Sequence, residues 1–347
     1  MYVTCVGRPG CQSTRDSVSP NTSTSNSADS TQTSSLPTPR ATSPTIPARL
    51  ADRRTLTIAA GVAAVAVVVL ASVAHTTALS PIKAIILGAV EGITEFLPIS
   101  STGHLIVTER LLGLGTGTAK TAADTYAVAI QLGAILAVLG IYRDHIASIA
   151  RGLLGRDAAG LRLAKLLVVA FIPSAVVGLA LDNTIKTHLF GTWPVIAAWI
   201  IGGAFLLAWR PRTGHLQLGQ LTMKHAAIIG GAQILALWPG TSRSLVTIAA
   251  ALAIGLTVST AVEFSFLLGL MTLSAATALD LAKHGNDLTN QFGLATPTLG
   301  AIVACITAAI AVTWFVNYLK TRPMTIFGCY RLGAALIAIA LIATNRI

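Results

Sequence analysis

Charged residues are scarce in this sequence, since Asp, Glu, Lys and Arg together make up only 11% of the 347 residues. A soluble domain carries about a quarter charged residues, so this scarcity excludes an ordinary soluble globular protein. Hydrophobic residues instead make up 53%, and apolar runs close to the length that crosses a bilayer recur along most of the chain. The composition predicts an all-α membrane protein with several transmembrane helices.

Acidic residues are even scarcer than basic ones, 13 against 24, which gives a formal net charge of +11. The basic residues lie mainly in short connections between apolar runs, as in the Arg-rich loop predicted over residues 143–165. This pattern is the positive-inside bias of membrane proteins, so we expect no nucleic-acid partner. Cysteine is rare too, and the spacing of the four cysteines matches no metal site.

Large apolar side chains are few in the first 54 residues, which are dominated by Ser, Thr, Pro and Asn. Such a stretch cannot bury enough apolar surface to offset its ordering entropy, so we predict a disordered tail over residues 1–54. Basic residues then precede an apolar run. We expect residues 55–76 to form an extra N-terminal transmembrane anchor, with a cleaved signal peptide as the alternative. The main membrane domain is predicted over residues 77–347.

Two pairs of apolar segments are too short to cross a membrane, and each pair is interrupted by proline. The first pair, over residues 81–114, breaks at Pro98, and the second, over residues 225–256, breaks at Pro239. Proline disfavours helix in the residue before it, and a following Ser or Thr can cap a new helix. Each pair is therefore predicted to be a re-entrant helical hairpin, covered by protein or by a polar cavity.

The two halves of the chain resemble each other weakly around these breaks. Residues 91–101 align with residues 232–242 when Pro98 is placed on Pro239. If every strongly basic loop lies on one side of the membrane, the two hairpins enter from opposite faces. Opposite entry combined with internal similarity is typical of an inverted repeat whose broken helices meet near the midplane. The fold prediction is a polytopic helical bundle built as an inverted repeat.

The first hairpin carries two carboxylates within an apolar segment. Glu91 and Glu95 are four residues apart, which places both on one face of a helix. Ionisable groups are costly at such depth, so both are candidates for function. Adjacent carboxylates repel each other unless a cation lies between them, and hard oxygen ligands suit Mg²⁺ or Ca²⁺ held jointly with phosphate oxygens. The structural alternative is an ion pair between a glutamate and Arg243.

Hydroxyl side chains follow both prolines, where new helices are expected to begin. The unpaired N–H groups of a first helical turn favour an anion, and two converging helix starts would cradle a diphosphate. Arg243 adds a planar charge that can hold phosphate through two hydrogen bonds. Ser101 offers a nucleophile and His104 a proton carrier, although such a histidine can also be a packing residue and such hydroxyls simple caps. The other predicted phosphate-binding residues are Ser100, Thr102, Gly103, Thr241, Ser242, Ser244 and Thr247.

Two long motifs stand in this order: Glu91-Gly-Ile-Thr-Glu-Phe-Leu-Pro-Ile-Ser-Ser-Thr-Gly-His104 and Pro239-Gly-Thr-Ser-Arg-Ser244. They resemble the motifs of the undecaprenyl-diphosphate phosphatases, also called bacitracin-resistance proteins, over about residues 78–345. The resemblance implies six core spanning helices, two re-entrant hairpins and a site open to the outer face of the bacterial cell membrane. One departure is Leu245, which stands where the family commonly has glycine.

The resemblance also implies an activity, namely hydrolysis of undecaprenyl diphosphate to the monophosphate and inorganic phosphate. This reaction recycles the lipid carrier of peptidoglycan synthesis and confers bacitracin resistance, and the family needs a divalent cation. Membrane lipids surround the expected protein, and a homodimer is kept as an option. The alternative function is a polyprenyl-phosphate flippase or transporter, because broken inverted repeats are a transporter architecture. Attack by Ser101 and direct attack by water both stay open.

Overall fold

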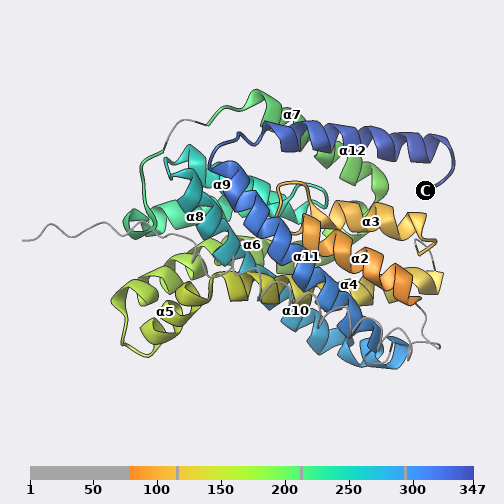
Figure 1. Cartoon of the computed structure of the whole chain (residues 1–347), viewed down its shortest axis with the longest axis horizontal. Helices are drawn as coiled ribbons and strands as arrows, with labels where there is room; N and C mark the ends of the chain where they lie inside the picture. The colour runs from red at the N-terminus through yellow and green to blue at the C-terminus, as the bar shows by residue number, and fades with distance from the viewer. Residues whose placement is uncertain (1–78, 115–116, 212–213, 293–294) are drawn as a thin grey trace, which may run out of the picture. The chain divides into compact units, whose positions relative to one another are not determined.

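The computed structural model describes residues 79–114, 117–211, 214–292 and 295–347 (Figure 1). Within these ranges the chain forms helices joined by short turns and no β-strand, which confirms the all-α prediction. The predicted disordered tail and the predicted N-terminal anchor lie outside the described residues, so both stay predictions.

The described helices include short helices on either side of the two breaks and several long apolar helices. In chain order they are α2 (Pro81–Thr94), α3 (Ser101–Leu111), α4 (Gly117–Ile141), α5 (Arg143–Leu153), α6 (Ala158–His188), α7 (Thr192–Ala208), α8 (Met223–Gln233), α9 (Arg243–Ala253), α10 (Val258–Phe292), α11 (Ala295–Leu319) and α12 (Thr325–Ala343). Two 3₁₀ turns, η2 (Leu218–Gln220) and η3 (Ile234–Leu237), precede and follow α8.

Four of the described helices are long and apolar enough to cross a membrane: α6, the Val258–Lys283 part of α10, α11 and α12. The apolar part of α4 and the following α5 meet at 82°, and counting this bent pair raises the number to five. Helix α7 is also apolar but has 17 residues. The chain is therefore a helical protein that crosses the membrane several times.

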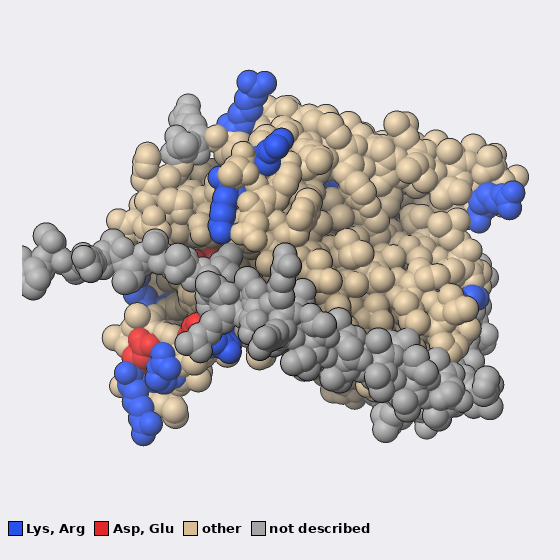
Figure 2. All heavy atoms as spheres, viewed as in Figure 1, with Lys and Arg blue, Asp and Glu red and all other residues tan. Residues whose placement is uncertain are grey.

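Helix α5 corrects the prediction of a basic loop over residues 143–165. Its residues are too polar for an apolar run that spans a membrane, but Arg143–Leu153 form a short amphipathic helix that packs on α6. Asp157 ends the turn after α5 by accepting hydrogen bonds from Ser148 Oγ (2.7 Å) and from the Gly160 N–H (3.0 Å). On the face shown in Figure 2, Lys and Arg side chains lie mainly toward the end that carries α5.

Both predicted breaks are present, and each is followed by a helix with the same unusual cap. Ser100 precedes α3 with φ 73° and Ser242 precedes α9 with φ 76°, and each hydroxyl accepts a hydrogen bond from an N–H in the first turn. The two caps lie two residues after Pro98 and three residues after Pro239. The sequence alignment that paired the two prolines is therefore wrong by one residue beyond them, because the second break contains an extra residue.

The helices of the two halves pack against each other in a reciprocal way. Helix α2 of the first hairpin lies along α11, and α8 of the second hairpin lies along α6. Helices α7 and α12 lie side by side (Figure 1). An edge contact between aromatic rings fastens the first break to α10, with 5.3 Å between the centroids of Phe96 and Phe266. A similar contact of 5.3 Å between Phe315 and Phe327 joins α11 to α12. The breaks are thus embedded in the apolar core of the bundle.

Candidate active site at the two helix breaks

A cavity of about 660 Å³ lies where the two breaks meet α6 and α10. Apolar side chains of α6 and α10 form most of one wall. Both breaks contribute to its polar lining: Glu95, Ser100, Ser101, Thr102, Gly240, Ser242 and Arg243. The fold therefore brings the two sequence motifs to one cavity, as predicted from their chemistry.

An ion pair crosses this cavity between the two motifs. Arg243 Nη2 lies 3.2 Å from Glu95 Oε1, and both side chains are about nine-tenths buried. The guanidinium also donates to the Ser265 carbonyl (3.3 Å) and lies over the ring of Phe96, 5.6 Å from its centroid. Gly269 makes room for it, because a Cβ there would stand 1.8 Å from Arg243 Nη1. The ion-pair alternative for the acidic pair is thus realised at Glu95.

The second carboxylate oxygen of Glu95 accepts a hydrogen bond from Ser101 Oγ. Ser101 is the first residue of α3, so its hydroxyl stands at the start of that helix. A carboxylate is a proton acceptor when it is ionised, and the other oxygen of Glu95 is paired with the positive charge of Arg243. Glu95 therefore lies in the position of a general base toward the Ser101 hydroxyl.

His104 is held by the protein through both ring nitrogens. Its Nδ1 lies 2.6 Å from the Ser100 carbonyl oxygen, which can only accept, so Nδ1 carries the proton. Nε2 then accepts a hydrogen bond from the Tyr330 hydroxyl at 2.9 Å. The ring also packs against Trp199 (4.8 Å between centroids) and Tyr330 (5.6 Å). In this arrangement His104 steadies the first turn of α3, in line with the packing alternative.

The remaining predicted phosphate-binding residues divide into those that line the cavity and those behind it. Ser242, which lines the cavity, and Ser244, which lies behind its wall, both donate through Oγ to the Leu97 carbonyl, at 3.3 Å and 2.8 Å, and so join the second break to the first. Thr247 Oγ1 lies 2.6 Å from Ser265 Oγ and ties α9 to α10. Among the described residues, the cavity wall does not include Gly103, Thr241, Ser244 or Thr247.

Leu245 does not disturb the second motif at the position where glycine is common in the family. Its side chain is 4% exposed within the core, and α9 runs through it without interruption. Its N–H donates to Ser242 Oγ at 3.3 Å, so the cap forms with leucine in place.

Arg331 was not predicted to belong to the site, although it is fully buried in α12. Its guanidinium donates to the carbonyls of both breaks, to Pro98 O (3.3 Å), Gly240 O (2.8 Å) and Thr241 O (3.2 Å), and to Ala198 O of α7 (2.7 Å). It thereby fixes the two breaks relative to each other. The sequence did contain a signal for Arg331, because an arginine within an apolar span is energetically costly and is therefore a candidate for function.

The donor set at the acidic pair fits a hard divalent cation only in part. Glu91 is 2% exposed and stands one helical turn before Glu95, whose N–H donates to the Glu91 carbonyl at 2.9 Å. In the part of the chain that the structure describes, no three His, Cys, Asp or Glu side chains gather into a metal site. Two carboxylates are a small set, so phosphate oxygens would have to complete the coordination.

The part of the chain that forms this site is similar to known proteins. The family model "Bacitracin resistance protein BacA" matches residues 84–337, which include both breaks and Arg331. The undecaprenyl-diphosphatase of Sorangium cellulosum is 44% identical over 257 residues, covering 72% of this chain and 82% of the relative. That of Nitrosomonas eutropha is 44% identical over 262 residues, covering 74% and 93%. "Undecaprenyl-diphosphatase 2" of Rhodospirillum rubrum is 42% identical over 264 residues, covering 75% and 94%. The chain therefore belongs to the bacitracin resistance protein BacA family.

Proposed function

We propose that this protein is an undecaprenyl-diphosphatase, which hydrolyses undecaprenyl diphosphate to undecaprenyl phosphate and inorganic phosphate. Its relatives carry that name at 42–44% identity over most of their length. The observation that carries the proposal is the contact series Ser101–Glu95–Arg243, which joins the two motifs inside one cavity. In the cell this reaction returns the lipid carrier to peptidoglycan synthesis and opposes bacitracin.

The arrangement supports an in-line attack by Ser101 Oγ on the terminal phosphorus. Glu95 takes the hydroxyl proton while the bond from phosphorus to the bridging oxygen breaks, and undecaprenyl phosphate leaves. Water then hydrolyses the phosphoserine and releases inorganic phosphate. Arg243 and the N–H groups at the two helix starts stabilise the charge on the transferring group. The rival mechanism is direct attack by water that Glu95 positions and deprotonates.

A divalent cation, Mg²⁺ or Ca²⁺, is proposed to bind between Glu91, Glu95 and the diphosphate oxygens. When bound, it would neutralise part of the diphosphate charge in a cavity with mainly apolar walls. The support is the burial of two carboxylates one turn apart, which share the single positive charge of Arg243. Chelator should abolish phosphate release and added Mg²⁺ or Ca²⁺ should restore it. Full activity in excess chelator would rule the cation out.

We also infer an inverted repeat in the bacterial cell membrane, with the cavity open to the outer side. Its six core spans would be α4, α6, α7, α10, α11 and α12, and the pairs α2–α3 and α8–α9 would be re-entrant hairpins. The matching caps Ser100 and Ser242 and the reciprocal packing of α2 on α11 and α8 on α6 support this arrangement.

Phosphate release in detergent tests the activity against the flippase alternative, because a micelle has no second compartment for transport. Purified full chain should release inorganic phosphate from undecaprenyl diphosphate with multiple turnovers. The matched control is Arg243→Ala, which leaves the rest of the cavity wall in place. Correctly folded protein that releases no phosphate, yet moves the lipid between the leaflets of a vesicle, would favour the flippase.

A further inference from the structure

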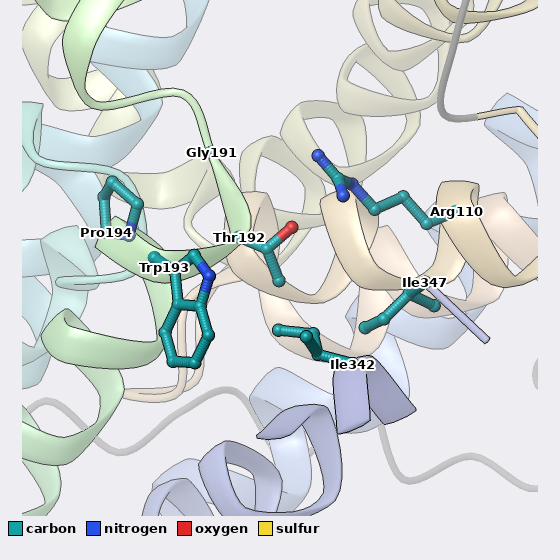
Figure 3. A pocket seen from close by; sticks show the side chains of 7 residues that line it. All are labelled: Arg110, Gly191, Thr192, Trp193, Pro194, Ile342 and Ile347. Atoms are coloured by element: carbon teal, nitrogen blue, oxygen red, sulfur yellow. The ribbon is translucent and has the colours of Figure 1, made fainter. Parts of the chain in front are cut away.

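A second cavity, of about 310 Å³, lies outside the active site where the ends of α3, α7 and α12 meet (Figure 3). Its lining consists of Arg110, Gly191, Thr192, Trp193, Pro194, Ile342 and Ile347. Arg110 is nine positions beyond Ser101 on α3, about 14 Å along the helix at 1.5 Å per residue. The proposed hydrolysis makes no use of this cavity.

The first turn of α7 presents unpaired donors to the cavity. Gly191 is the cap residue, and no side chain of the described residues caps this helix start. Pro194 has no N–H, so the free amides of the first turn are those of Thr192 and Trp193. Helix α7 has 17 residues, and its N-terminus therefore carries the partial positive charge of a full helix dipole. Such a start favours an anion.

The side chain of Thr192 gives independent evidence of a missing ligand. It is 6% exposed, and its Oγ1 has no hydrogen-bond partner among the described residues. Figure 3 shows this oxygen pointing toward the guanidinium of Arg110 across the cavity. A buried hydroxyl without a partner costs free energy, and a ligand oxygen between Thr192 and Arg110 would satisfy it.

The other walls indicate where the ligand's remaining atoms go. Trp193 is 62% exposed, and tryptophan is enriched at the level of lipid headgroups. Ile342 lies beside the Trp193 ring and below Thr192, and adds an apolar wall (Figure 3). The side-by-side helices α7 and α12 continue from the cavity with exposed apolar side chains, which are Ile200, Ile201, Leu336 and Ile337. A headgroup in the cavity would thus lie above a surface suited to hydrocarbon chains.

We propose that this cavity is a binding site for a phosphate group, held by Arg110, the Thr192 hydroxyl and the first N–H groups of α7. Arginine binds phosphate through two hydrogen bonds, and a helix start adds further donors from one side. The same chemistry would accept the phosphate of an anionic membrane lipid or free inorganic phosphate. The apolar surface below the cavity favours the lipid.

Native mass spectrometry of the delipidated full chain in detergent tests the site. The probes are dioleoyl phosphatidylglycerol, dioleoylglycerol as the same chains without phosphate, and inorganic phosphate. The variants are Arg110→Gln and Thr192→Val, which remove the charge and the hydroxyl. Arg322→Gln is the matched control, because it removes an exposed arginine before the opposite end of α12. Thr192→Val deletes a group without a partner, so the fold should not lose stability.

Phosphatidylglycerol should bind the parent chain and the control with equal affinity. Its affinity for Arg110→Gln should be about tenfold lower, since a hydrogen bond to a charged group contributes about a tenfold change in affinity. Thr192→Val should weaken binding by roughly threefold while the melting temperature stays unchanged. The diacylglycerol should not distinguish the variants. If inorganic phosphate alone shows the same differences, the site takes the free anion. If neither phosphate probe distinguishes Arg110→Gln from Arg322→Gln, the proposal is wrong.

Discussion

Glu95 has two contacts that use different carboxylate oxygens, and the chemistry of the site depends on both. One oxygen meets Arg243 and the other meets Ser101. The arginine holds the carboxylate in place, and the carboxylate can take the proton of the serine. Each of these residues therefore affects the other two, so single substitutions should be strongly non-additive.

Arg243→Ala should lower phosphate release at least a hundredfold, because losing a preorganised charge toward a transferring phosphoryl group costs about 3 kcal/mol. Arg243→Lys should retain only a small fraction of the rate. Lysine keeps the charge but cannot reach Glu95 and the Ser265 carbonyl with two separate nitrogens, as the guanidinium does. Initial rates of monodisperse preparations at saturating substrate measure both effects. A lysine variant as fast as the parent would show that a point charge suffices.

Serine attack and water attack predict different results at Ser101. If Ser101 is the nucleophile and Glu95 its base, Ser101→Ala and Glu95→Gln should each lower the rate by about a thousandfold or more, and the double variant should be no slower than either. If water attacks directly, Ser101→Ala should stay within about tenfold of the parent while Glu95→Gln remains inactive. Rapid-quench trapping of labelled phosphoprotein in the parent provides the control.

The sequence predicts which residues face the cavity better than it predicts their partners. Glu95, Ser101 and Arg243 could be found because charged and hydroxyl groups stand out against apolar segments. Their hydrogen bonds could not be found, because these depend on how α2, α3 and α9 meet in space. Arg331 was missed for the same reason, since its partners are carbonyl groups, which every residue has.

The caps of α3 and α9 show how a break in a helix is stabilised by its own backbone conformation. Ser242 has a φ of 76°, a region that costs an L-residue about 1–2 kcal/mol. Glycine adopts this region without that cost. It has no side chain to cap the helix, and replacing a serine cap by glycine costs a few tenths of a kcal/mol.

Substitutions at Ser242 should therefore invert the usual order of helix formers. Ser242→Ala loses the cap and keeps the strain, so its free energy of unfolding should fall by about 1 kcal/mol. Ser242→Gly loses the cap and the hydrogen bond to the Leu97 carbonyl but relieves the strain, so it should unfold close to the parent. Ser244, inside α9, is the matched control, and there glycine should be worse than alanine by about 1 kcal/mol. Thermal unfolding in detergent measures all four. The same order at both positions would contradict a strained cap.

Helix α5 is held against α10 by a contact that responds to pH. His145 Nε2 lies 2.5 Å from Glu263 Oε1, and the hydrogen bond to this carboxylate raises the pKa of His145 above its usual value near 6.5. A raised pKa means that the folded protein binds the proton more tightly than the unfolded chain does. The resulting stability is fully present below about pH 6.5 and is lost as the pH rises through the folded pKa.

His145→Gln should accordingly lower the melting temperature at pH 6 and have little effect well above neutral pH. The gain is about 1 kcal/mol, because the imidazole is partly exposed and solvent weakens the ion pair. Melting curves of parent and variant at several pH values check this, with Lys224→Gln as a distant control for net charge. A difference between parent and His145→Gln that grows with rising pH would have the wrong sign for this contact.

The long apolar helices could be predicted from the sequence more closely than the number of times the chain crosses the membrane. The apolar runs 299–319 and 326–344 marked α11 and α12 to within a few residues, because burial in lipid demands such runs. The runs 166–182 and 260–281 marked only the apolar middle of α6 and the first part of α10, whose polar ends extend further. Helix α5 was missed because it has no apolar run, although Ile146, Ile149 and Leu153 recur in it at helical spacing. Whether helix α7 crosses the membrane stays ambiguous, because its 17 residues are at the lower limit of the length that spans a bilayer.

The proposed six-span topology can be decided by counting crossings between two basic turns. Arg156 precedes α6 and Arg322 follows α11. If α6, α7, α10 and α11 all cross and the α8–α9 hairpin returns to its own side, the two arginines lie on the same side. If α7 does not cross, three crossings remain and the arginines lie on opposite sides. The positive-inside bias favours the first arrangement, with both turns in the cytoplasm.

Single cysteines introduced at Arg156, Arg322 and Asn345 of a cysteine-free variant should separate these cases. In intact cells, a membrane-impermeant maleimide should label position 345, beyond α12, and should label 156 and 322 only after permeabilisation. Phosphate release by each variant confirms that the labelled protein is folded. Labelling of 156 and 322 from different sides would remove α7 from the spans and with it the inverted repeat. Labelling of both from outside, with 345 protected, would keep the repeat and reverse its orientation.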